Sequence, residues 1–401
     1  MYIATARQAP GGTAGRGRVA GNVLALGLVS LVTDVSSEMV TAVLPLYFVV
    51  ALGLSPFQFG VLDGLYSGVT AVVRLLGGHV ADRWQRRKAV ALTGYGLSAL
   101  AKLGLLAVGS SVVALGGVLA VDRTGKGLRT APRDALISLS STPDTLGRAF
   151  GVHRAMDTVG AFIGPLVAMF VLWASLGDYD AVFVTSFCVA ALGVVLLGLL
   201  VRDHRAPTPA RPPLKTLWRK PFRRMVGWAA VLGVVTVGDA FLYLVLQQRL
   251  GLDAVHFPLL ALGTAAVYLL LAVPLGRLAD RVGRWPVFLA GHVALALAFG
   301  LLLTPYAGAV VVLVLHGVFY AATDGVLMAA ASPLLPAELR TSGMAVLQTG
   351  QALAKLVSSV LFGAMWTLWG VSTAILVSLV LLACVLAGAV VGRPLSPRPS
   401  S

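Results

Sequence analysis

The sequence is poor in charge and in cysteine. Only 12% of its 401 residues are charged, against about 25% in soluble domains, and 58% are hydrophobic. This balance indicates an integral membrane protein, and it argues against nucleic-acid binding although the net charge is +15. The only cysteines, Cys188 and Cys384, lie in apolar runs and predict no disulfide framework. Without a Walker-type glycine loop or a His/Cys cluster, no cofactor, metal or enzymatic activity is expected.

Apolar runs separated by short polar breaks predict an all-α membrane protein with twelve spanning helices. Most runs have at least the roughly 20 residues that cross a bilayer. Cytoplasmic loops should carry the excess of Lys and Arg. If both termini lie in the cytoplasm, Arg249 is the only Lys or Arg that falls in a loop on the outer side. The expected helices cover residues 21–50, 56–80, 88–108, 111–133, 148–175, 180–201, 223–249, 256–278, 285–304, 307–334, 342–369 and 371–392.

These helices form two halves joined by a basic linker. We expect a disordered cytoplasmic tail over residues 1–20, a six-helix bundle over 21–201, a cytoplasmic linker over 202–222, a second six-helix bundle over 223–392 and a cytoplasmic tail over 393–401. The tail shows no signal-peptide pattern, so the first apolar run should be retained as a helix. The expected location is the cytoplasmic membrane, and the charged linker suits contact with anionic lipid.

One segment contradicts the apolar background. Residues 121–136 read VDRTGKGLRTAPRDAL, and a helix would place Asp122, Lys126, Arg129 and Arg133 on one narrow stripe. Each ionised group at bilayer depth costs at least about 2.5 kcal/mol. The stripe should therefore face protein or water.

A short motif occurs once in each half, after an even-numbered helix in both. Its members are Gly78, Asp82, Arg83 and Arg86 in the first copy and Gly276, Asp280, Arg281 and Arg284 in the second. With this repeat the chain resembles the major facilitator superfamily over residues 21–393. The resemblance implies two pseudo-symmetric six-helix bundles that transport a small molecule by alternating access, as a monomer. Gln85 stands where the motif has its second glycine, which the second copy keeps as Gly283.

A second resemblance lies on the expected fifth helix. Gly151, Gly160, Gly164 and Pro165 are spaced as in the superfamily's antiporter signature, although the closing glycine pair is absent. Small residues also let membrane helices approach closely in any bundle. Arg123 matches an arginine that many exporters of this superfamily carry on helix 4.

Carboxylates occur on each helix that lines the central cavity in this superfamily, namely helices 1, 4, 7 and 10. They are Asp34 with Glu38, then Asp122, Asp239 and Asp324. Apart from Glu38, they fall near the expected midplane, where transporter sites are found. Glu38 follows Asp34 by one helical turn, so the two side chains could share a proton.

We therefore expect proton coupling to depend on Asp34, Glu38, Asp122 and Arg123. Arg123 and Lys126 are expected to be the cations that face Asp34 and Glu38. The alternative is that these charges form buried ion pairs that only fix helix packing. Lys102 is expected in such a structural pair.

Substrate-binding candidates carry a charge at membrane depth. They are Lys126, Arg129, Arg154, Asp157, Asp239 and Asp324. The basic residues of the first half favour an anionic or zwitterionic substrate, while a cationic drug, which would rely on the carboxylates, stays open.

The repeated motif predicts a cytoplasmic gate. By resemblance, Asp82 should lie at the start of the helix over 342–369, where the helix dipole favours a negative charge, and Arg86 should pair with Asp134. We expect proton-coupled efflux of a small organic molecule. Proton-coupled import by the same residues is the alternative, and a sensor or enzyme on a transporter scaffold is a further one.

Overall fold

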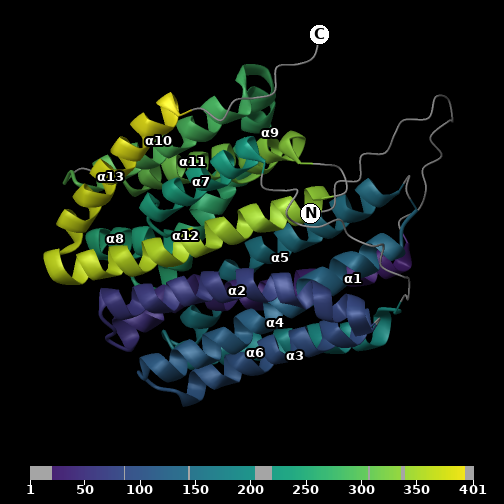
Figure 1. Cartoon of the computed structure of the whole chain (residues 1–401). Coiled ribbons are helices and arrows are strands. Elements are labelled where there is room, and N and C mark those ends of the chain that lie inside the picture. Colours follow the sequence, from purple (N-terminus) through teal and green to yellow (C-terminus); the bar gives the residue numbers. More distant parts are fainter. Residues whose placement is uncertain are drawn as a thin grey trace, which may run out of the picture. The chain divides into compact units, whose positions relative to one another are not determined.

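The structure is a computed structural model that describes residues 20–84, 86–142, 145–203, 219–305, 308–335 and 339–392, without the side chains of residues 74–84 and 341. Throughout this part the chain is helical and forms no strand (Figure 1). The predicted all-α class is confirmed. The chain packs as two units: the first unit is Met1–Tyr47 with Val69–Pro209, and the second unit is Phe48–Gly68 with Ala210–Ser401.

The helices begin and end close to their expected positions. Those of the first half are α1 (Gly21–Leu46), continued by a π-helical turn (Tyr47–Ala51), α2 (Pro56–Trp84), α3 (Arg87–Ala107), α4 (Val112–Leu139), α5 (Leu146–Ala174) and α6 (Tyr179–Leu200). Those of the second half are α7 (Lys220–Val235), α8 (Asp239–Leu250), α9 (Pro258–Val282), α10 (Arg284–Leu302), α11 (Ala309–Ala331), α12 (Arg340–Trp369) and α13 (Val371–Val391). In the described part, ten single or joined helices are long and apolar enough to cross a membrane. α2 and α4 add 29 and 28 residues, which also exceeds the roughly 20 required.

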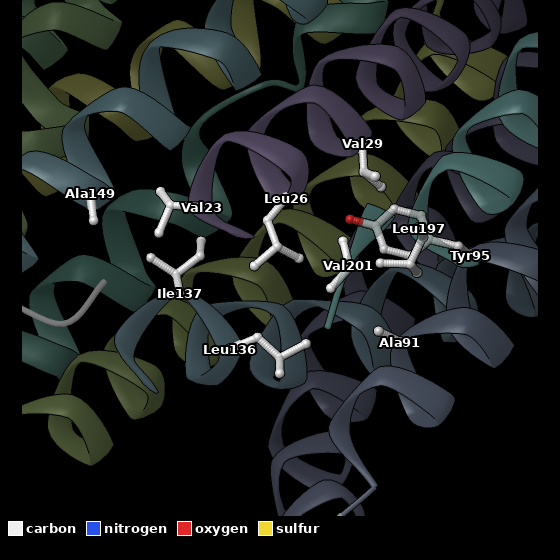
Figure 2. Close-up of a cluster of buried hydrophobic side chains, with 10 residues drawn as sticks. All are labelled: Val23, Leu26, Val29, Ala91, Tyr95, Leu136, Ile137, Ala149, Leu197 and Val201. Atoms are coloured by element: carbon white, nitrogen blue, oxygen red, sulfur yellow. The ribbon is translucent and has the colours of Figure 1, made fainter. Parts of the chain in front are cut away.

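Apolar side chains hold one end of the first unit together. Figure 2 shows a buried cluster that includes Leu26 of α1, Leu136 of α4, Ala149 of α5 and Leu197 of α6. Tyr95 of α3 brings the cluster's one hydroxyl group, and this oxygen has no hydrogen-bond partner among the described residues. The cluster joins five helices and so fixes the depth of the charged residues farther along them.

The seventh spanning segment is broken, so the expected continuous helix over 223–249 is wrong at this point. α7 ends at Val235, the backbone is extended at Thr236 and Gly238, and α8 begins at Asp239. The hydroxyl of Ser358 in α12 donates a hydrogen bond of 2.6 Å to the Thr236 carbonyl oxygen. A backbone break at membrane depth needs such a partner, because lipid offers none.

Candidate functional site

The first unit contains a fully paired charge cluster between α3 and α4. The Asp122 carboxylate accepts a hydrogen bond from Ser98 and forms an ion pair with Arg123, while the Lys102 ammonium lies 3.9 Å away. All four residues are buried. The expected ion pair of Lys102 is thus present. Arg123 contacts its neighbour Asp122, which differs from the expected position facing Asp34 and Glu38.

A second cluster joins α1, α4 and α5. The Arg129 guanidinium is 3.4 Å from an Asp34 oxygen, and the two side chains are 3% and 14% exposed. The Asp34 and Asp157 carboxyl groups act on each other electrostatically across α1 and α5. Ser30 donates a hydrogen bond of 2.8 Å to Asp157, and Arg133 lies 3.9 Å from the same oxygen. The close carboxylate pair of this unit is therefore Asp34 with Asp157, on two different helices, in place of the expected pair along α1.

Two charges of the first unit are less engaged. Among the described residues, Glu38 and Lys126 form no ion pair, although Lys126 lies within electrostatic range of both Glu38 and Asp34. Both side chains are partly exposed. Arg154 pairs with Asp157 at 3.6 Å, as its spacing along α5 predicts, and is 74% exposed. Lys126 is thus a cation that can still accept a partner.

The expected gate is only partly within view. Gly78, Asp82 and Arg83 fall in residues 74–84, outside the described side chains. Asp134 pairs with Arg133 at 3.0 Å, which replaces the expected contact with Arg86. The reason is local: Arg133 is the adjacent residue on α4, whereas Arg86 is an exposed residue before α3.

The second copy of the motif lies at the turn between α9 and α10, where Gly283 and Arg284 fix its conformation. Gly283 ends α9 with φ 103°, a backbone conformation that favours glycine. Arg284 then pairs with Asp280 at 3.1 Å and donates a hydrogen bond of 2.6 Å to the Ala329 carbonyl oxygen of α11. Gly276 lines a pocket with Asp280 and Arg284, whereas Arg281 is exposed without a contact to them.

The antiporter-like glycines of α5 pack against α1. A Cβ atom at Gly160 would overlap the Leu31 carbonyl oxygen, and one at Gly164 would lie 2.7 Å from the Cβ atom of Glu38. Gly151 has open space around it, and Pro165 lies inside α5. Two of the three glycines therefore allow α5 to bring Asp157 against α1.

In the second unit the charges meet at the helix break. Asp239 is the first residue of α8, and its carboxylate lies 3.5 Å from the Lys355 ammonium of α12 and 3.7 Å from the His316 imidazole of α11. Tyr320 donates a hydrogen bond to it. The side chains of Lys355 and Asp239 are 38% and 32% exposed, so this pair is open to a ligand.

Sequence reasoning missed Asp63 and did not assign Lys355. Asp63 of α2 accepts a hydrogen bond of 2.6 Å from Ser359 of α12 and lies within electrostatic range of Lys355 and Asp239. A carboxylate inside an apolar run was the available signal. Asp324, expected with Asp239, is exposed and accepts a 3.4 Å hydrogen bond from Tyr268. Asp63 and Asp239 thus both interact with Lys355.

Comparison with known proteins finds one family whose model matches most of the chain. The model of the Major Facilitator Superfamily matches residues 26–267 and 239–401. The chain belongs to the Major Facilitator Superfamily. It is therefore a membrane-embedded, multi-pass transporter of the MFS type, and members of this superfamily handle small-molecule substrates.

Relatives of this MFS chain agree on the family. An uncharacterised MFS-type transporter of Methanocaldococcus jannaschii is 27% identical over 358 residues, which cover 86% of this chain and 88% of that protein. The multidrug resistance protein MdtH of Photorhabdus laumondii is 29% identical over 176 residues. That match spans 43% of this chain and 42% of the relative, so it is partial.

Solved structures share the MFS fold. Nucleoside transporter NupG, in a mutant form, superposes with a TM-score of 0.80 at 16% identity and covers 92% of this chain and 99% of its own. A POT family transporter in complex with 5-aminolevulinic acid gives a TM-score of 0.77 at 12% identity, over 93% and 96% of the two chains. At these identities the likeness concerns the fold alone.

Proposed function

We propose that this MFS protein exports a small organic molecule in exchange for protons, and that the Asp34 and Asp157 carboxyl groups carry the coupling proton. The observation that supports this most is that Asp157 of α5 accepts a hydrogen bond from Ser30 of α1, while Arg129 contacts Asp34 and Arg133 contacts Asp157. Each of these arginines contacts one of the two carboxylates. The pair can therefore exist with or without a proton.

The electrostatics of the pair explain how a proton could change the helix contacts. For any two unit charges of like sign, a separation of about 4 Å gives a repulsion of about 4 kcal/mol at an effective dielectric constant of about 20. A proton on one of them replaces this repulsion with a hydrogen bond. When the proton leaves, the second charge must be offset by Arg129 and Arg133. Proton release thus strengthens the contacts of α4 with α1 and α5, and proton binding weakens them.

The substrate is expected to contact charges that have free capacity. In the first unit these are Lys126 and Glu38, and in the second unit Asp239 and Lys355. Lys355 lies 3.5 Å from Asp239, and about a third of each side chain is exposed. A ligand charge can compete for either member of such a loose, half-exposed pair. An anionic or zwitterionic substrate would use the lysines, and a cationic one the carboxylates.

Two observations favour export over import. The glycines at 160 and 164 follow the antiporter-like pattern, and they pack α5 against the helix that carries Asp34. In addition, part of the chain is similar to a multidrug resistance protein. Import by proton symport would use the same carboxylates with the opposite flux, so the direction needs a transport measurement.

The test begins with a thermal-shift screen of the purified protein against organic anions, organic cations and neutral metabolites, at about pH 6 and about pH 8. A molecule that binds the folded state raises its apparent stability by mass action. A radiolabelled hit is then followed in proteoliposomes with an imposed pH gradient. Accumulation should occur on the acidic side. Asp34→Asn and Asp157→Asn should abolish the effect of the gradient but leave downhill flux of the hit.

The matched control is Asp180→Asn, because Asp180 is an exposed carboxylate at the start of α6. It should transport like the natural protein. Gradient-driven accumulation that persists in both Asp34→Asn and Asp157→Asn would refute the proposed coupling. Accumulation on the alkaline side would refute export and favour symport.

A further inference from the structure

A buried histidine lies one helical turn from the proposed proton pair. His153 of α5 is 4% exposed, and its Nε2 atom has no hydrogen-bond partner among the described residues. Burying such a polar atom without a partner is unfavourable, because it loses its hydrogen bonds to water. An apolar residue would pack equally well at this position. A buried histidine here therefore suggests a chemical role.

The surroundings of His153 consist of the same charges as the proton pair. Asp157 follows it by four residues on α5 and therefore lies on the same face. The charged groups that act on it electrostatically include Arg133 and Asp134 of α4 and Arg154 and Asp157 of α5. Arg133 also lies 3.9 Å from Asp157, so His153 and the proton pair share these neighbours.

His153 also lies between Asp157 and the expected cytoplasmic end of α5. His153 lies about 6 Å nearer the start of the helix than Asp157, at 1.5 Å per residue. The distribution of Lys and Arg predicts that this start faces the cytoplasm. A proton that moves along α5 between the carboxyl pair and the cytoplasm must pass the level of His153.

We propose that His153 transfers protons between the Asp34 and Asp157 pair and the cytoplasmic end of α5. The relay transfers one proton in net terms and changes only bonds to hydrogen. The carboxyl O–H of Asp157 gives its proton to one ring nitrogen, which forms a carboxylate and an imidazolium. The other ring nitrogen then releases its proton toward the cytoplasm and restores the neutral ring. Imidazole suits this role because one ring nitrogen can accept a proton while the other releases one. The inference rests on the proposed function, since it requires the carboxyl pair to bind protons.

The test follows proton arrival at the pair without any substrate. Protein in nanodiscs is jumped from about pH 8 to about pH 5 while the C=O stretching band of protonated carboxyl groups is recorded by time-resolved infrared spectroscopy. Loss of the band in Asp34→Asn or Asp157→Asn assigns it to the pair. In His153→Ala the band should reach the same amplitude but appear at least about tenfold more slowly, as expected when a positioned proton carrier is removed. Added imidazole should restore the rate.

A polar replacement and a control complete the design. His153→Gln keeps a hydrogen-bonding side chain but cannot transfer the proton, so it should be as slow as His153→Ala. It also decides the question if the alanine variant fails to fold. His256→Ala, in an exposed turn, should keep the natural rate and ignore imidazole. Natural rates in the folded His153 variants, or slow rates that imidazole does not restore, would overturn the relay. A natural protein without a band that depends on Asp34 or Asp157 would instead refute the proposed coupling.

Discussion

Replacing Arg129 with methionine should destabilise the protein strongly. The guanidinium lies 3.4 Å from Asp34, and both side chains are almost fully buried. Arg129→Met puts an apolar side chain in its place and leaves Asp34 beside Asp157 without its ion-pair partner. Removing one partner of a buried ion pair typically costs about 3–5 kcal/mol, because the other charge stays buried and uncompensated. We expect a loss of this size in the free energy of unfolding.

A second substitution isolates the cause. Adding Asp34→Asn to Arg129→Met removes the uncompensated charge, so most of the stability should return. A deficit of about 1 kcal/mol should remain, because the Arg129 guanidinium also lies 4.3 Å from the centroid of the Tyr95 ring. Tyr95→Phe is the matched control. It keeps the ring and removes a buried hydroxyl without a hydrogen-bond partner among the described residues, so its cost should stay below about 1 kcal/mol.

The assay is reversible unfolding of the purified protein in mixed micelles at about pH 8, followed by tryptophan fluorescence. The four proteins, natural, two single variants and the double variant, form a double-mutant cycle whose coupling energy reports the interaction of the pair. A coupling of about 2 kcal/mol or more is expected. If the double variant loses as much as the sum of the singles, the ion pair does not stabilise the first unit and the reasoning is refuted.

Three further predictions concern helix packing, the second unit and pH. Gly160→Leu should abolish transport, since its side chain would meet the α1 backbone, whereas Gly151→Leu, in open space, should transport normally; a flux assay with the screened ligand checks both. Ser359→Ala should cost about 1–3 kcal/mol of unfolding free energy, because Asp63 loses its 2.6 Å hydrogen bond, and an unchanged midpoint in the same micelle assay would contradict this. If protons and substrate compete, the thermal shift produced by the ligand should be smaller at about pH 6 than at about pH 8. Asp34→Asn should remove this difference. Repeating the thermal-shift screen on the variant at both pH values checks it.

Most of the helical architecture could be predicted from the sequence. Long apolar runs must become helices in a bilayer, because only a helix or a closed barrel satisfies every backbone hydrogen bond there. The expected helix over 371–392 corresponds to α13 at Val371–Val391, and the one over 342–369 to α12 at Arg340–Trp369. The break at Thr236–Gly238 was missed because residues 223–249 are apolar on both sides of it. Its stability depends on Ser358, more than a hundred residues away.

The site could be predicted only as a set of residue types. Charges at membrane depth marked Asp34, Asp157 and Asp239 as functional candidates, but spacing along one helix favoured Glu38 as the partner of Asp34. The structure instead places Asp157 of α5 against α1, where it accepts a hydrogen bond from Ser30, one turn before Asp34. The glycines at 160 and 164 permit that approach, and no pattern within α1 alone could report it.

Composition and the repeated motif by themselves determined that this is a twelve-helix transporter. Hydropathy is a property of each segment, and the backbone hydrogen bonds of a helix join residues that are close in sequence. The pairing of charges was decided only by the tertiary structure. An ion pair depends on a few ångströms between side chains on different helices, and that distance is set by how closely their backbones pack. Arg123 illustrates the difference: its sequence position matches an exporter motif, yet its closest carboxylate is its own neighbour Asp122.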